Sequence, residues 1–157
     1  MSRSVGNALP AEVLAALAQG DLPARAGWAL PVITVDAQGR AHPMLCSYLE
    51  VRAVDARTVR LVVAAGSGSA ENLAGRRGAT LIVAEAETVA YVTCGVAAGP
   101  RVIGGLARFD LVVEDVLLDA ADPREGASRV TAGVRFAPAT ALDGEWARAV
   151  LEALGAE

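Results

Sequence analysis

The feature that most constrains the fold of this chain is a long run of strand-like segments joined by turns. Between Ala29 and Phe136, apolar stretches rich in small and β-branched residues are separated by turn signals such as Asp36-Ala37-Gln38-Gly39 and Asp55-Ala56-Arg57. Strands and helices do not alternate regularly, so a doubly wound sheet is not expected. The pattern predicts a mainly β (α+β) fold, with an antiparallel barrel and short helices at its ends.

Three helical segments accompany the strands. The first covers about residues 10–19, with Pro10 at its first position and Gly20 after its end. A second begins after Ser69, which we expect to be its N-cap, and reaches about Arg77. The third covers about residues 144–154, behind Asp143. The predicted strands are 27–35, 41–54, 58–65, 80–86, 88–97, 106–118 and 129–136, with a glycine-rich loop over 95–105.

Length and hydropathy indicate a single globular domain over residues 1–157. The composition is 54% hydrophobic, which argues against disorder. No apolar run approaches the roughly 18 residues of a membrane span, and the first residues lack the apolar core of a secretory signal. Cys46 and Cys94 show neither disulfide-framework nor metal-ligand spacing. A cytoplasmic protein without membrane contact is therefore the expectation.

The charged residues exclude several functions. All 14 basic residues are arginines, so neither a Schiff-base lysine nor a P-loop lysine is available. The net charge of −4 and the lack of an arginine-rich stripe argue against a nucleic-acid partner. With a single histidine, His42, and two distant cysteines, the chain has few of the ligands that a metal site needs. A catalytic triad would have to use His42, and no Gly-x-Ser-x-Gly motif accompanies it. If the chain is an enzyme, we expect a bound cofactor to carry the reaction.

One segment has the composition of a phosphate-binding corner. In Gly66-Ser67-Gly68-Ser69-Ala70-Glu71-Asn72-Leu73, two glycines and two hydroxyls join the end of a buried strand to the start of a helix. A helix N-terminus offers free N–H groups and partial positive charge to an anion. The simpler interpretation is an ordinary turn with a serine cap.

Two further stretches precede this corner, Gly39-Arg40-Ala41-His42 and Ser47-Tyr48-Leu49-Glu50-Val51. The corner itself reads Ser67-Gly68-Ser69-Ala70-Glu71-Asn72-Leu73. In this order the three motifs resemble Gly-Arg-x-His, Ser-Tyr-x-Glu-Val and, after a small-residue turn, Ser-Arg-Thr-Ala-x-Asn-Leu in one branch of the pyridoxamine-5′-phosphate-oxidase-like FMN-binding split-barrel family. The resemblance covers roughly Ala29 to Asp119, with order and spacing preserved.

The resemblance implies a six-stranded antiparallel split β-barrel, a homodimer, and FMN at the dimer interface. Its phosphate-side candidates are Ser67, Ser69 and Asn72, and its candidates near the isoalloxazine ring are Ser47 and Tyr48. The third strand would offer the backbone of Val62, Val63 and Ala64. No catalytic residue is indicated.

One position departs from the family. Arg or Lys usually stands where this chain has Gly68, so Arg40, Arg52, Arg76 or Arg77 would have to neutralise the phosphate. Three functions follow: an FMN-dependent oxidoreductase acting on a small-molecule substrate, a flavin-binding module without turnover, or a barrel that has lost FMN and binds haem or a deazaflavin. His42 as a surface histidine and Tyr48 as a packing residue remain the simpler interpretations.

Overall fold

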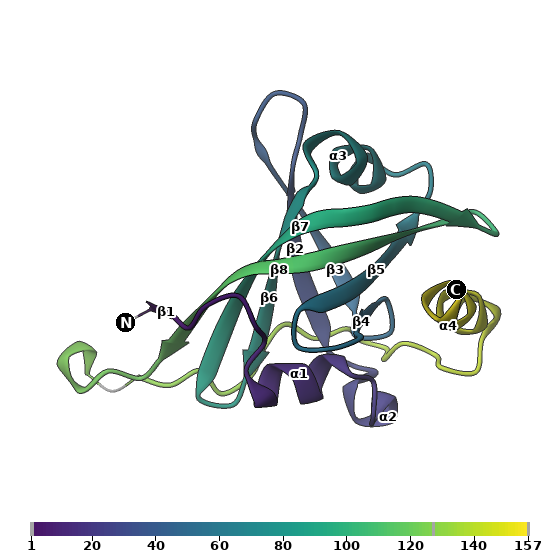
Figure 1. Cartoon of the computed structure of the whole chain (residues 1–157). Coiled ribbons are helices and arrows are strands. Elements are labelled where there is room, and N and C mark those ends of the chain that lie inside the picture. The colour runs from purple at the N-terminus through teal and green to yellow at the C-terminus, as the bar shows by residue number, and fades with distance from the viewer. Residues whose placement is uncertain (1, 127, 157) are drawn as a thin grey trace.

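The computed structural model describes residues 2–126 and 128–156, and its centre is one antiparallel sheet curled into a half-barrel (Figure 1). The strand order is β3-β2-β6-β7-β8-β5-β4, and β1 pairs with β8. The six longer strands are β2 (Ala29–Val35), β3 (Ala41–Ser47), β5 (Thr58–Ala64), β6 (Gly78–Glu85), β7 (Thr88–Ile103) and β8 (Leu106–Ala120). Short strands β1 (Arg3–Ser4) and β4 (Val51–Ala53) bring the sheet to eight. The mainly β, antiparallel split-barrel class expected from the sequence is confirmed.

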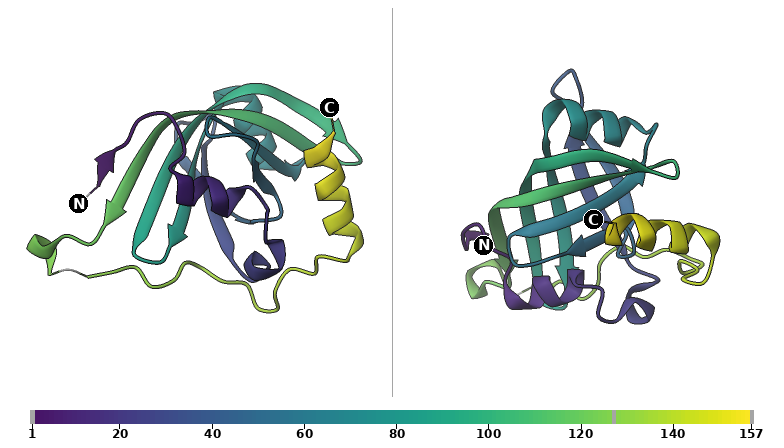
Figure 2. Two further views of the ribbon diagram at one scale, coloured as in Figure 1. Left: turned by 60° about the horizontal axis from the view of Figure 1, so that its bottom comes forward. Right: turned by 45° about the vertical axis from the view of Figure 1, so that its right-hand side comes forward.

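The helices lie around the sheet. At one end of the barrel are α1 (Ala11–Leu17) and α2 (Leu22–Arg25), and at the opposite end is α3 (Gly68–Arg76) (Figure 1). Helix α4 (Glu145–Gly155) lies at the side and contacts β5 and β8 (Figure 2). A short 3-10 helix, η1, covers Pro123–Glu125. The three predicted helices are confirmed, and α2 was not predicted.

The predicted glycine-rich loop over 95–105 is wrong, because β7 runs through most of it. Irregularities interrupt the pairing with β8 between Thr93 and Arg101, so glycine and proline enter the strand at bulges. Gly99 has φ +117°, and a Cβ there would lie 2.7 Å from the carbonyl oxygen of Arg108. Only the end of the segment, Gly104 and Gly105, turns the chain into β8.

Two predicted strands are also corrected. Residues 41–54 form two strands, because the chain turns after Ser47, where the N–H of Glu50 donates to the Ser47 carbonyl at 3.0 Å. Residues 129–136 contain no strand, only a bridge between Arg135 and Trp28. This segment crosses the start of β2 and pairs too briefly to build a ladder.

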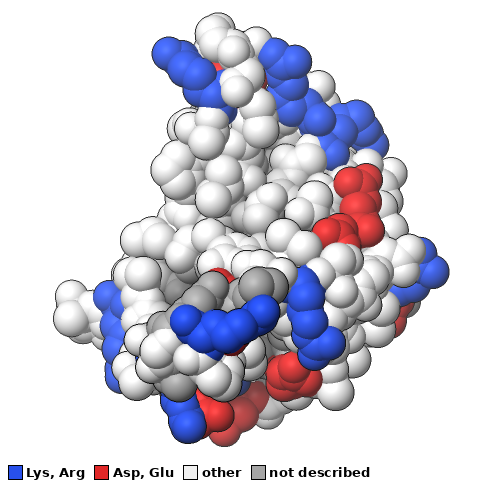
Figure 3. All heavy atoms as spheres, turned by 90° about the vertical axis from the view of Figure 1, so that its left-hand side faces the viewer, with Lys and Arg blue, Asp and Glu red and all other residues white. Residues whose placement is uncertain are grey.

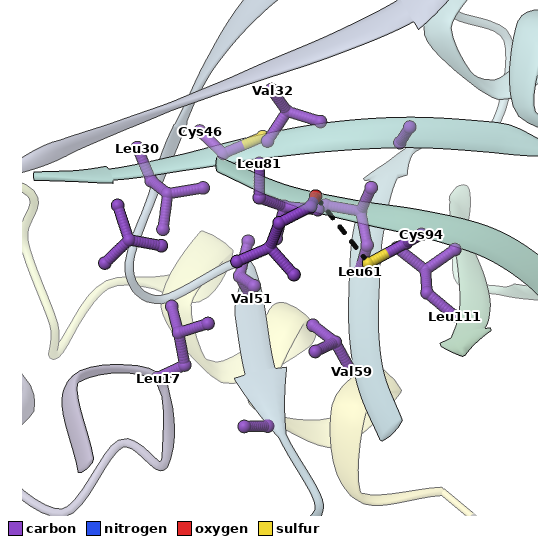
Figure 4. Packing of buried hydrophobic residues seen from close by; sticks show 14 of the residues in the cluster. Leu17, Leu30, Val32, Cys46, Val51, Val59, Leu61, Leu81, Cys94 and Leu111 are labelled. Atoms are coloured by element: carbon purple, nitrogen blue, oxygen red, sulfur yellow. Dashed lines mark hydrogen bonds between the residues drawn. The ribbon is translucent and has the colours of Figure 1, made fainter. Parts of the chain in front are cut away.

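Two apolar clusters stabilise the fold. The larger fills the barrel, where Leu17 of α1 joins strand residues such as Leu30, Leu81 and Phe109; Figure 4 shows Leu17, Val51 and Leu81 around one interior space. Burying each such side chain contributes roughly 1.5–3 kcal/mol. The smaller cluster packs Val150 and Leu154 of α4 against the strands. No helix in the described ranges is long and apolar enough to cross a membrane.

Candidate functional site

The strand β5 leads directly into the start of α3. The N–H of Ser67 donates to the Ala64 carbonyl at 3.0 Å and closes a turn, and the Ser67 hydroxyl accepts from the N–H of Ala70 at 3.2 Å. Ser67 is therefore the N-cap, and the prediction that Ser69 caps the helix is wrong. The helix begins two residues earlier than expected because Ser67 has the extended backbone of a cap (φ −84°, ψ 152°).

The first turn of α3 keeps unused hydrogen-bond donors. Among the described residues, the N–H groups of Gly68 and Ser69 meet no acceptor, and neither does the Ser69 hydroxyl. Ser69 is only 5% exposed, whereas Gly68 is exposed. The free Ser69 hydroxyl lies next to the free N–H groups that open the helix, so the first turn of α3 offers several hydrogen-bond donors.

A short chain of hydrogen bonds connects α3 to two strands. The Asn72 side-chain amide donates to the Thr34 hydroxyl at 3.0 Å, and that hydroxyl donates to the His42 carbonyl at 3.3 Å. Thr34 is fully buried on the inward face of β2. Sequence analysis missed Thr34, although a polar residue in the inward series of Leu30 and Val32 was the signal for it. Ser67, Gly68, Ser69 and Asn72 are called the α3 corner below.

The side chain of His42 lies against this corner. A Cβ built on Gly68 would be 3.6 Å from Cε1 and 3.8 Å from Nε2 of the imidazole. Both distances are those of ordinary van der Waals contact, so the imidazole lies directly beside the first residue of α3.

The arginines proposed to neutralise a phosphate have other contacts. Arg40 binds the carboxylate of Asp36 at 2.9 Å. Arg76 donates to the carbonyls of Asp36 and Ala37, so it fixes the β2–β3 turn to α3. Arg77 donates to the Val96 carbonyl at 2.7 Å, and Arg52 lies on β4 opposite Arg60.

The third-strand candidates differ in access. Val62 is fully buried in the cluster beneath α4, and its N–H donates to the Glu50 carbonyl at 2.9 Å. Val63 is buried in the barrel core. Ala64 is exposed at the end of the strand, next to the α3 corner. The corner therefore brings together Ser67, Ser69, Asn72 and, beside them, Ala64.

The C-terminus of α4 is held by two arginines. Arg60 donates to the Leu154 carbonyl at 2.7 Å, and the buried Arg108 donates to the carbonyls of Ala153 and Ala156. Both guanidinium groups form ion pairs with Asp110, at 3.4 and 3.3 Å. These contacts fix α4 over Val62.

The two ring-side candidates are buried and have partners within the chain. The Ser47 hydroxyl and N–H donate to the Glu50 carboxylate, at 2.9 and 2.6 Å. Burial raises the pKa of Glu50, although these two donors act in the opposite direction. Tyr48 lies in the core, with the guanidinium of Arg25 5.0 Å from its ring centre, and burial raises its pKa to about 12. Arg25 in turn binds Glu85 with both terminal nitrogens.

The outer face of the sheet carries a shallow groove of about 380 Å³. Its lining includes Ile33, Val35, Thr80, Thr93 and, at its rim, Arg76. The exposed side chains of Val35 (40%) and Leu45 (53%) belong to the neighbouring strands β2 and β3. Figure 3 shows a hollowed face that is largely uncharged in its middle and has arginines along its upper rim. Within the described residues, no group of three or more His, Cys, Asp or Glu side chains is placed to hold a metal ion.

Comparison with known proteins identifies the fold. No family model and no curated protein matches the sequence. A presumed pyridoxamine 5′-phosphate oxidase of Lactobacillus delbrueckii is similar over 73% of this chain and 98% of its own, with TM-score 0.57 and 15% identity. A conserved hypothetical protein of Mycobacterium tuberculosis is similar over 84% of this chain and 98% of its own, with TM-score 0.51 and 11% identity.

A third similar structure is HutZ, the haem storage protein of Vibrio cholerae. It covers 72% of this chain and 96% of its own, with TM-score 0.50 and 14% identity. At such low identities the likeness concerns the fold alone. The chain has the split-barrel fold of the pyridoxamine-5′-phosphate-oxidase-like proteins.

Proposed function

We propose that this chain binds FMN, with the phosphate held at the α3 corner, and that it is a flavin-dependent oxidoreductase acting on a small molecule. The observation that carries the proposal is the first turn of α3. Two backbone N–H groups and the hydroxyl of Ser69, which is only 5% exposed, lack partners among the described residues. Helix N-termini with free donors bind phosphate groups.

The chain's own residues would hold and orient the cofactor. Ser67 keeps the first turn in place through its bond to the N–H of Ala70. Asn72 ties the helix to β2 through Thr34, so that the donors of Gly68 and Ser69 stay fixed. A bound flavin would supply the electron and hydride transfer. Ser47 and Tyr48 are buried and already have partners inside the chain, and their contact with the flavin ring stays a prediction.

We also propose a homodimer with the cofactor at its interface. The groove on the outer face and the exposed Val35 and Leu45 give the molecule an apolar surface that a second copy can cover. The C-terminal end of α3 adjoins this surface, because Arg76, the last residue of the helix, lines the groove. Light scattering at micromolar concentration tests this point, and a monomer there would contradict it.

Titration calorimetry with FMN and with riboflavin tests the binding proposal. The two ligands differ only in the phosphate, so a preference for FMN is expected. Equal affinities, or no binding of either, would refute the phosphate site. Turnover is tested separately, by following reoxidation of the reduced flavin after a nicotinamide donor; a flavin that binds without turnover indicates a binding module.

The haem or deazaflavin alternative has its own measurement. HutZ, which shares the fold, is a haem storage protein, and the single histidine of this chain is exposed beside the α3 corner. These two observations support haem as the alternative ligand. Titration with haem that gives a sharp Soret band, together with no binding of FMN, would replace the flavin proposal.

A further inference from the structure

The only histidine of the chain is placed where an anion at the α3 corner would meet it. His42 lies on β3, the strand at the edge of the sheet, opposite Thr34 of β2. It is exposed, and its imidazole approaches the position of a Gly68 Cβ within 3.6 to 3.8 Å. Gly68 is also the residue whose free N–H opens α3.

The cations that could compete for this role have carbonyl or carboxylate partners. Arg40 binds Asp36, and Arg76 binds the carbonyls of Asp36 and Ala37. Arg77 follows the last residue of α3, at the helix end away from the corner, and donates to Val96. His42 is therefore the basic side chain that the described contacts place beside Gly68 at this corner.

We propose that His42, in its protonated form, supplies the positive charge of the α3 corner, so that its affinity for a phosphate rises as the pH falls. This inference rests on the proposed function, because it concerns the phosphate that the corner would hold. An imidazolium and the free N–H groups of Gly68 and Ser69 would together surround the phosphate oxygens.

The surroundings of His42 are mostly neutral. From β2 it is paired with Thr34, and from α3 it lies beside Gly68. The charged residues on these stretches are Glu71, in the first turn of α3, and the Asp36–Arg40 pair at the β2–β3 turn. Glu71 is exposed, and the charges of Asp36 and Arg40 offset each other.

An imidazole side chain ordinarily changes its charge between about pH 5 and pH 8. Its protonated form attracts a phosphate and its neutral form does not, so the affinity is expected to rise as the pH falls. A phosphomonoester also loses a proton near pH 6, which acts against this trend at lower pH. Comparing variants at the same pH removes this second effect, because the ligand is the same in every case.

The experiment measures affinities of FMN and riboflavin by calorimetry at pH 6 and pH 8. The proteins are wild type, His42→Gln, His42→Arg and, as a control that removes a cation elsewhere, Arg129→Gln, whose side chain is exposed and pairs with Glu87. At pH 6, wild type should bind FMN about tenfold more tightly than His42→Gln; at pH 8 the two should agree. His42→Arg should bind FMN tightly at both pH values, and Arg129→Gln should follow wild type. Riboflavin should not distinguish the variants.

Two results would overturn the inference in different ways. If wild type prefers FMN to riboflavin but His42→Gln keeps that preference at pH 6, the phosphate site stands and His42 has no part in it. If no protein prefers FMN, the proposed function fails and this inference fails with it. Circular dichroism checks that the substitutions at the exposed position 42 leave the fold intact.

Discussion

The N-terminus of α3 and the C-terminus of α4 show two opposite treatments of a helix end. At α4, the last carbonyls accept hydrogen bonds from Arg60 and from the buried Arg108, and Asp110 lies between these arginines. At α3, one N–H is capped by Ser67 while those of Gly68 and Ser69 have no partner among the described residues. A helix end that is filled by the protein's own groups is structural, and one left with free donors is suited to a ligand.

The largest expected effect on stability comes from removing a side chain that binds the C-terminus of α4. Arg108→Ala removes the donor to Ala153 and Ala156 and leaves one cation near Asp110. Loss of one partner from a buried charged network should lower the free energy of unfolding by about 3 kcal/mol. Urea denaturation followed by circular dichroism measures this change.

A matched arginine provides the control. Arg129→Ala removes a side chain that is 61% exposed and pairs with the exposed Glu87. Its effect on the free energy of unfolding should stay within about 0.5 kcal/mol. Equal losses in the two variants would contradict a special role of Arg108 at α4.

A smaller effect on stability is expected at the N-terminus of α3, where Ser67 caps the N–H of Ala70. Ser67→Ala removes the hydroxyl that accepts from the N–H of Ala70. Loss of an N-cap typically costs about 1 kcal/mol of folding free energy. Thermal and urea unfolding both report it. Ser67→Asp, which restores an acceptor at the cap, should recover most of the stability; no recovery would argue against capping.

Ser69→Ala sharpens the comparison because its hydroxyl has no partner to lose. Stability should change by less than about 0.5 kcal/mol. FMN affinity should fall about fivefold, as expected for one lost hydrogen bond, with riboflavin affinity unchanged. Calorimetry on the folded variant separates this outcome from Ser67→Ala. A stability loss as large as that of Ser67→Ala, with FMN binding intact, would make the α3 corner purely structural.

The smallest effect concerns the partly buried carboxylate of Glu50, which, unlike that of Asp110, forms no ion pair with any described residue. Burial raises the pKa of Glu50 above its ordinary 4.5. Between that value and the raised pKa the native state binds more protons than the unfolded chain, so stability falls as the pH rises. Glu50→Gln should weaken this decline. Urea denaturation from pH 4 to pH 7 measures it, and identical pH profiles for the two proteins would refute it.

The sequence was most informative where pattern and chemistry agreed. The alternation of apolar residues in Leu30, Val32 and Leu81 reflects inward strand faces, and the amphipathic pattern around Val150 and Leu154 gave α4 within one residue at each end. The loop predicted around Gly99 was wrong, because a glycine in a bulged strand and a glycine in a loop give the same sequence pattern.

The site was less predictable than the fold because side-chain partners depend on distant residues. Ser67 and Ser69 both suit a cap, and only the backbone conformation decides between them. The proximity of His42 to Gly68 joins residues from β3 and α3, and no local pattern reveals it. Tyr48 resembles a ligand contact by position, yet it is buried with Arg25 as its neighbour.

The docking of α4 has a consequence for biosynthesis. Arg60 and Arg108 come from strands that are synthesised well before their acceptors at residues 153–156. Until α4 emerges from the ribosome, the nascent barrel exposes Val62 and Leu106 and leaves two guanidinium groups without the carbonyls they later bind. Domains fold as the chain is synthesised. A stalled or proteolysed product lacking α4 would therefore expose an aggregation-prone apolar surface to other nascent chains and to chaperones.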